Sequence, residues 1–229
     1  MNVDRAAGAL LVGLPVAFNL FFFLLGRFFD YPGILRSPVG TILTRYQAGG
    51  LRLKLLWYGF MLTAVLLAPL AVLLGQVLAR DDLEIVPVTT TIGVLAAAVQ
   101  FLGLARWPFL VPALARAYES PDSSPATREA TAVVFDSFNR YLGVAVGECL
   151  GYLLTGAWTL LVASAMLQSS SFAEWLAWPG IAVGALLVIG SLEFVGSSED
   201  GWRLAGTIVP IAYTAWSLWL AAAGIVVLT

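Results

Sequence analysis

The sequence predicts an all-α, polytopic membrane protein: a bundle of six transmembrane helices with both termini outside the cell. Three observations lead to this fold class. The 229 residues are 60% hydrophobic and 11% charged, whereas soluble domains carry about 25% charged residues. Six ranges are apolar for about 20 residues or more, long enough to cross a bilayer as a helix. The basic residues gather in alternate connections, as the positive-inside rule requires.

The apolar ranges set the expected elements in chain order. They are residues 6–26, 55–79, 85–105, 141–167, 178–195 and 204–227. The fifth of these is the shortest. In a chain this hydrophobic, the number of spans is a better guide to domain organisation than the chain length. We therefore expect one transmembrane domain over residues 1–229.

Arginine and lysine set the predicted direction of the chain. Ten of the twelve basic residues lie in the first, third and fifth connections, and Arg5 and Arg80 are the two on the other side. Basic loops stay with the cytoplasm, so both termini are expected outside. An even number of spans agrees with this orientation.

The third connection, residues 106–140, is predicted to form a cytoplasmic linker with interfacial helices. Residues 110–118 are expected to form a short helix at the interface. Residues 127–141 are expected to form an amphipathic helix that continues into the fourth span. Between them, "ESPDSSP" is rich in serine, proline and aspartate, which is typical of a turn.

Polar side chains cross the apolar ranges at a similar depth. At about 1.5 Å per residue, Glu148 lies roughly 12 Å and Gln100 roughly 9 Å from the inner boundary. An acid inside a bilayer costs several kcal/mol, so it normally faces the bundle interior. We therefore predict a ligand site in the cytoplasmic leaflet. Its candidate residues are Glu148, Gln100, Asn19, Arg106, Tyr152, Glu193 and Tyr213.

Glycines accompany the acid in the stretch "GVAVGECLGYLLTG". Gly143, Gly147 and Gly151 recur every four residues beside Glu148. Small residues at this spacing let a second helix approach closely. These three glycines are therefore predicted helix-packing positions. The polar face next to them carries the acid toward neighbouring helices rather than lipid.

Two interpretations of the polar layer stay open here. In the first, it lines a cavity open to the cytoplasm that binds a polar or cationic group or passes a proton. In the second, the layer is a closed network of hydrogen bonds that fixes the register of neighbouring helices. In both, the expected partners of Glu148 are Arg106 as counter-charge and Gln100 or Asn19 as donor. The first favours a protein that binds, transports or senses a small molecule or lipid; the second favours a structural accessory subunit of a larger membrane complex.

The composition argues against several other kinds of site and function. The chain has no histidine and one cysteine, so no histidine-ligated haem or zinc is possible within it, and no metal or cofactor is predicted. No nucleophile–base pair is recognisable, so an enzyme is the weakest hypothesis and no catalytic residue is assigned. A net charge of −2 gives no attraction to nucleic acid. Membrane lipids are the expected partners, with a homo-oligomer or a larger membrane complex left open.

Three segments carry a resemblance to a known family. They are "FLGLARWPFLVPALAR" (101–116), "FNRYLGVAVGECLGYLLTGAWTLL" (138–161), and "GSLEFVG" with "GWRLAGTIVPIAYTAWSLWL" (190–220). Over about half of the chain, the sequence resembles a family of uncharacterised bacterial multi-pass membrane proteins, defined as a domain of unknown function. The resemblance implies a bacterial inner membrane and a compact helical bundle. It transfers no catalytic residue, because the family has no assigned activity.

Overall fold

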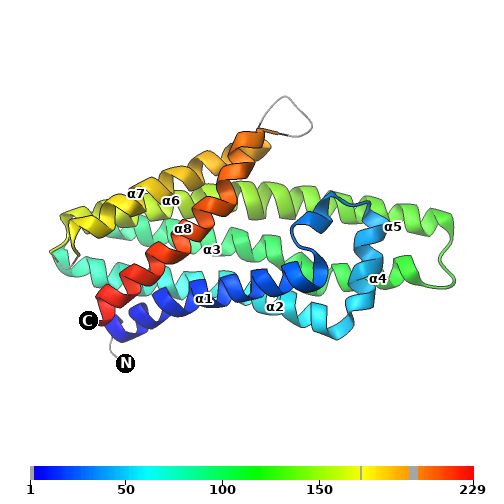
Figure 1. The fold of residues 1–229 in the computed structure, drawn as a ribbon, viewed down its shortest axis with the longest axis horizontal. Coiled ribbons are helices and arrows are strands. Elements are labelled where there is room, and N and C mark those ends of the chain that lie inside the picture. Colours follow the sequence, from blue (N-terminus) through cyan, green and yellow to red (C-terminus); the bar gives the residue numbers. More distant parts are fainter. Residues whose placement is uncertain (1–2, 171, 196–200) are drawn as a thin grey trace.

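The structure is a computed structural model that describes residues 3–170, 172–195 and 201–229. Every regular element within these ranges is a helix (Figure 1). The α-helices are α1 (Val3–Phe29), α2 (Val39–Leu78), α3 (Val86–Phe109), α4 (Val111–Glu119), α5 (Pro125–Phe138), α6 (Gly151–Gln168), α7 (Glu174–Gly190) and α8 (Arg203–Leu228). The other elements are the 3₁₀ turns η1 (Gly33–Arg36), η2 (Ala79–Asp81) and η4 (Ser191–Phe194), and the π-helix η3 (Asn139–Leu150).

The all-helical class is confirmed, and six helical stretches among the described residues are long and apolar enough to cross a membrane. They are Val3–Phe29, Val39–Asp81, Val86–Glu119, Pro125–Gln168, Glu174–Phe194 and Leu204–Leu228. Both termini lie at one end of the bundle (Figure 1), as an even number of spans requires. Which side of the membrane this end faces stays a prediction.

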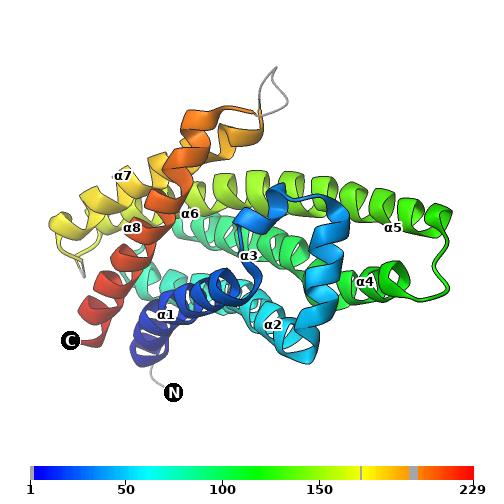
Figure 2. The same cartoon turned by 45° about the vertical axis from the view of Figure 1, so that its right-hand side comes forward.

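The bundle has a termini end and an opposite end, which we call the α4/α5 end. α1 packs against α2 and α8, α3 packs against α2 and α6, and α7 packs against α6 and α8. α1 and α8 meet closely at the termini end, where a Cβ atom on Gly8 would lie 3.1 Å from the carbonyl oxygen of Gly224. From there the two helices run apart toward the α4/α5 end (Figure 2).

The α4/α5 end contains the two helices predicted for the third connection. α4 and α5 pack against each other as a helical hairpin. Ser124 caps α5, and its Oγ accepts a hydrogen bond from the Thr127 N–H at 3.1 Å. Such a cap satisfies a backbone donor that the first turn of a helix leaves free. α5 then continues through η3 into α6, so one helical rod extends well beyond the neighbouring spans (Figure 1).

The first connection contains more structure than the sequence suggested. Residues 27–54 were expected only as a basic connection, but a helix begins at Val39 and continues into the second span. Gly50 breaks its direction, with φ 54° and ψ −142°, a conformation that glycine adopts without the steric cost of a Cβ atom. The segment before Gly50 turns its buried Ile42, Leu43 and Tyr46 toward the bundle.

Two apolar cores stabilise the bundle, one near each end. The first surrounds Leu11, Leu70 and Trp158. The second gathers aromatic side chains at the α4/α5 end, where the Trp57 and Trp107 rings stack 4.3 Å apart. Tyr213 packs against the first core and Phe18, Tyr31 and Leu104 against the second, so the space between these side chains lies at the junction of the two cores.

Candidate functional site

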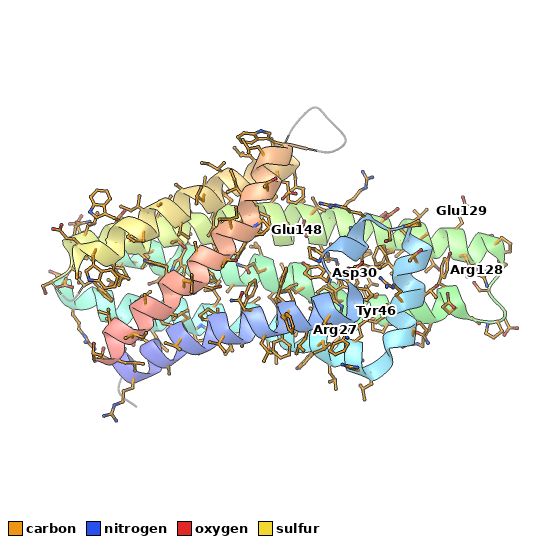
Figure 3. All side chains as sticks on the ribbon, viewed as in Figure 1. Arg27, Asp30, Tyr46, Arg128, Glu129 and Glu148 are labelled. Carbon is orange, nitrogen blue, oxygen red and sulfur yellow. The ribbon has the colours of Figure 1, made fainter. Side chains whose placement is uncertain are left out.

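A twelve-residue π-helix, Asn139–Leu150, forms one wall of the candidate site. In a π-helix the backbone hydrogen bonds join residues i and i+5 rather than i and i+4. π-Helices are rare in proteins, and those that occur often lie at functional sites. Residues four and five apart therefore fall on nearly the same side of it. Figure 3 shows Glu148, within this element, midway along the bundle where α8 crosses in that view.

The glycines of this region face α3. A Cβ atom on Gly147 would lie 2.9 Å from the Cα of Gly103, and one on Gly151 would lie 3.2 Å from Cγ of Gln100. A Cβ atom on Gly143 would lie 2.5 Å from Nη2 of Arg106. The π-helix and α3 thus touch backbone to backbone, and residues at intervals of four on one helix meet residues at intervals of three on the other.

A cavity of about 500 Å³ lies beside this contact. Residues of α1, η1, α3, the π-helix, η4 and α8 line it, together with Phe60 of α2 and Tyr152 of α6. The structure brings all of the predicted site residues to its wall: Asn19, Gln100, Arg106, Glu148, Tyr152, Glu193 and Tyr213. That they bind a ligand stays a prediction.

Arg106 is held in the wall by its own helix and by the π-helix. Its side chain is 7% exposed. It donates to the carbonyl oxygen of Gly103, and its Nη2 donates to Oδ1 of Asn139 at 3.0 Å. Its buried Nε has no hydrogen-bond partner among the described residues. A buried donor without a partner costs free energy, so this Nε adds to the cost of holding the guanidinium in the wall.

Glu148 lacks the direct partners expected from the sequence. Within the described ranges it forms no hydrogen bond or ion pair, and the positive charge of Arg106 acts on it from beyond contact distance. Arg106 is therefore the counter-charge of Glu148, as expected, but it acts at a distance and not through an ion pair. The physical reason is that Asn139 and the Gly103 carbonyl already hold the Arg106 guanidinium against Gly143.

The two expected amide donors also bond elsewhere. Asn19 Nδ2 donates to the carbonyl oxygen of Pro15 at 2.7 Å and to Oγ of Ser217 at 2.9 Å. Gln100 Nε2 donates to Oγ1 of Thr155 at 2.7 Å. Each amide is satisfied by the nearest oxygen on its own or an adjacent helix, because an unpaired polar group away from water is costly. Asn19 and Gln100 therefore connect helices and leave the Glu148 carboxyl group unpaired.

Aromatic rings make up much of the remaining wall. Tyr213 lies 5.8 Å from Phe18 in a stacked arrangement and 5.5 Å from Tyr152 in an edge-to-face arrangement. Phe22 meets Tyr31 edge to face at 5.6 Å. Sequence reasoning did not identify the phenylalanines or Tyr31 as site residues. The signal for α1 was the aromatic run "FNLFFF" around Asn19, which also fits a lipid-facing surface.

The end of the cavity nearer η1 and η4 carries a second pair of opposite charges. Arg36 and Glu193 both line it, and Arg36 is close enough to act on the charge of Glu193. A Cβ atom on Gly206 would lie 2.5 Å from Oε1 of Glu193, so glycine makes room for this carboxyl group. Nearby, burial raises the pKa of the Tyr31 phenol well above its usual value, and the charge of Glu148 adds to this rise. Tyr31 therefore stays a neutral donor at physiological pH.

Comparison with known proteins places the chain in a family. A family model described as a domain of unknown function (DUF4386) matches residues 6–224. The chain belongs to this family. The resemblance seen in the sequence is thereby confirmed, and it extends over nearly the whole chain rather than about half. No curated protein and no solved structure matches this DUF4386 member, so the function must be argued from its own geometry.

Proposed function

We propose that this multi-pass protein lies in the bacterial cytoplasmic membrane with both termini outside, and that its cavity binds a small amphiphilic molecule or lipid during transport or sensing. The orientation is supported by the distribution of basic residues. The two connections richest in arginine, residues 27–54 and 106–140, belong to the α4/α5 end (Figure 1), which is the end expected to face the cytoplasm.

The observation that carries the binding function is a cavity of about 500 Å³ whose acid has no direct protein partner. Ligand pockets are typically about 300–1,000 Å³, mostly apolar, with a few converging polar groups. This cavity combines aromatic walls with Glu148, Arg106 and Glu193. An intramembrane acid without a protein partner is expensive, and a polar ligand group at Glu148 would offset that cost.

The alternative, a structural accessory subunit of a larger membrane complex, is favoured by a different set of contacts. Asn19 and Gln100 each donate a hydrogen bond to a neighbouring helix, and the glycine contact between α3 and the π-helix is close backbone packing. These contacts hold neighbouring helices together. They do not account for the space beside Glu148, so binding is the better supported function.

A matched pair of variants tests the proposal. Val144 lines the cavity and Ala145, the next residue, is exposed on the outside of the same π-helix. Val144→Trp should fill the cavity, while Ala145→Trp adds the same ring on the outside. Native mass spectrometry of protein purified in mild detergent should find a bound non-protein mass on the wild type and Ala145→Trp, and lose it on Val144→Trp. The same occupancy in all three proteins, or no bound mass in any, would contradict the proposal.

A further inference from the structure

We infer that the ligand is a lipid that reaches the cavity from within the bilayer, through a lateral opening between α1 and α8. This inference rests on the proposed binding function and specifies the class of ligand and its route. The alternative is a water-soluble ligand that enters at the other end of the cavity, past the charged residues Arg36 and Glu193.

The two helices that flank the opening separate at a defined point. Near the termini end, the Gly8 and Gly224 backbones are in contact. Further along, Asn19 of α1 and Ser217 of α8 share the hydrogen bond of 2.9 Å. α1 and α8 run apart toward the α4/α5 end (Figures 1 and 2), so the Asn19–Ser217 bond and the stacked rings of Phe18 and Tyr213 mark the edge of the opening nearer the termini end.

Exposure shows which side of the cavity is open. The lining residues from α3 and the π-helix include Gly103, Arg106 and Gly143, which are buried. The lining residues from α1 and α8 include exposed ones: Asn19, Phe22, Pro210 and Thr214. Phe22 is 38% exposed although its ring also faces the cavity. The cavity is therefore closed toward α3 and open between α1 and α8, and it is also open at η1, where the lining residues Pro32 and Arg36 are exposed.

The depth of this opening identifies its surroundings. Asn19 lies ten residues before the end of α1 at Phe29, which is about 15 Å along a helix. Thr214 lies eleven residues after Arg203, about 16 Å along α8. The hydrocarbon core of a bilayer is about 30 Å thick, so the opening begins near the middle of the membrane and faces the acyl chains of the leaflet on the α4/α5 side. A molecule already dissolved in the bilayer meets no aqueous barrier there.

The chemistry along this route matches an amphiphile. Deep in the cavity, the carboxyl group of Glu148 offers an acceptor and the Arg106 side chain offers a positive charge to a polar head group. At the opening, Phe22 offers apolar contact to an acyl chain, and so does the exposed Ile211, which follows the lining residue Pro210 on α8. A lipid would thus place its head between the charged residues and its chain between α1 and α8.

The test uses a phosphatidylethanolamine that carries a photoreactive diazirine in its acyl chain. The protein is reconstituted into nanodiscs of phosphatidylethanolamine and phosphatidylglycerol with a small fraction of this probe, irradiated, and analysed by residue-resolved mass spectrometry. Cavity-wall residues Val144 and Leu104 report on the interior. The exposed Leu102 and Ala145 report on ordinary contact with lipid and serve as the internal standard.

Substitutions at the rim separate the lateral route from the others. Thr214→Trp should obstruct the opening and reduce labelling of the cavity wall about fivefold or more relative to the internal standard. A single bulky side chain at the rim is enough to cause a change of this size. Leu218→Trp, one turn further along α8 on the lipid-facing surface, should leave the labelling unchanged. Phe22→Ala should widen the opening and increase wall labelling, so the two rim variants move the signal in opposite directions in folded protein.

The outcomes distinguish this inference from the proposed function. Absent wall labelling in the wild type, or wall labelling that neither rim variant changes, would overturn the lateral route. If the bound mass is nevertheless lost on Val144→Trp, the cavity binds a ligand from the aqueous side and the proposed function stands alone. If no bound mass is found at all, the proposed function itself fails.

Discussion

The contact between Gly103 and Gly147 gives the sharpest prediction about stability. A Cβ atom on Gly103 would lie 2.5 Å from the Cα of Gly147, whereas ordinary contacts begin at 3.4 Å. Because the opposing atom belongs to the backbone, Gly103→Ala must push α3 away from the π-helix. Overpacking typically costs about 1–3 kcal/mol. Because the opposing atom is backbone and cannot move aside, the cost of Gly103→Ala is expected in the upper half of that range. Replacing glycine by alanine within a helix returns about 1 kcal/mol in helix propensity, so the expected net loss in unfolding free energy is about 1–2 kcal/mol.

A matched glycine provides the control. Gly13 also lies within a span, but a Cβ atom there would meet no atom within 4 Å. Gly13→Ala should therefore be neutral or stabilising by up to about 1 kcal/mol. Both variants can be unfolded by titration with sodium dodecyl sulfate in mixed micelles and followed by far-UV circular dichroism. The reasoning is refuted if Gly103→Ala unfolds at the same or a higher detergent fraction than Gly13→Ala.

Two further predictions concern the polar residues. Glu148→Gln should change the unfolding free energy by less than about 1 kcal/mol, because no direct protein partner is lost, yet it should remove most of the bound mass. A large loss of unfolding free energy, with the bound mass retained on the protein that still folds, would show instead that the acid is structural. Asn19→Ala should lower the unfolding free energy by roughly 0.6 kcal/mol and by no more than about 1.7 kcal/mol, the average and the maximum for hydrogen bonds between membrane helices, as measured by the same detergent titration. A loss near zero would mean that the bond to Ser217 does not hold α1 to α8.

Much of the architecture could be predicted because the lipid environment restricts the options. Backbone polar groups in hydrocarbon must be satisfied internally, so long apolar ranges leave helices as the natural element. Depth along a helix follows directly from residue count. For that reason, residues as distant in sequence as Asn19, Glu148 and Tyr213 could be assigned to one layer, and the structure places them around one cavity.

What could not be predicted depends on contacts between elements. A period of 3.6 residues was assumed throughout, so the π-helix over Asn139–Leu150 was missed, although glycines at intervals of four are compatible with its wider turn. The helix before Gly50 was missed because its apolar side is short and Arg45 stands between its buried Leu43 and Tyr46. The bond between Arg106 and Asn139 competes with the expected pairing to Glu148, and only the three-dimensional arrangement decides between such partners.

The most direct test of the account is an experimental density map of the protein in lipid nanodiscs, examined at Glu148. We predict non-protein density between Glu148, Arg106 and Tyr213 that continues outward between α1 and α8. A closed, empty interior in which the Glu148 carboxylate pairs directly with the Arg106 guanidinium would contradict it.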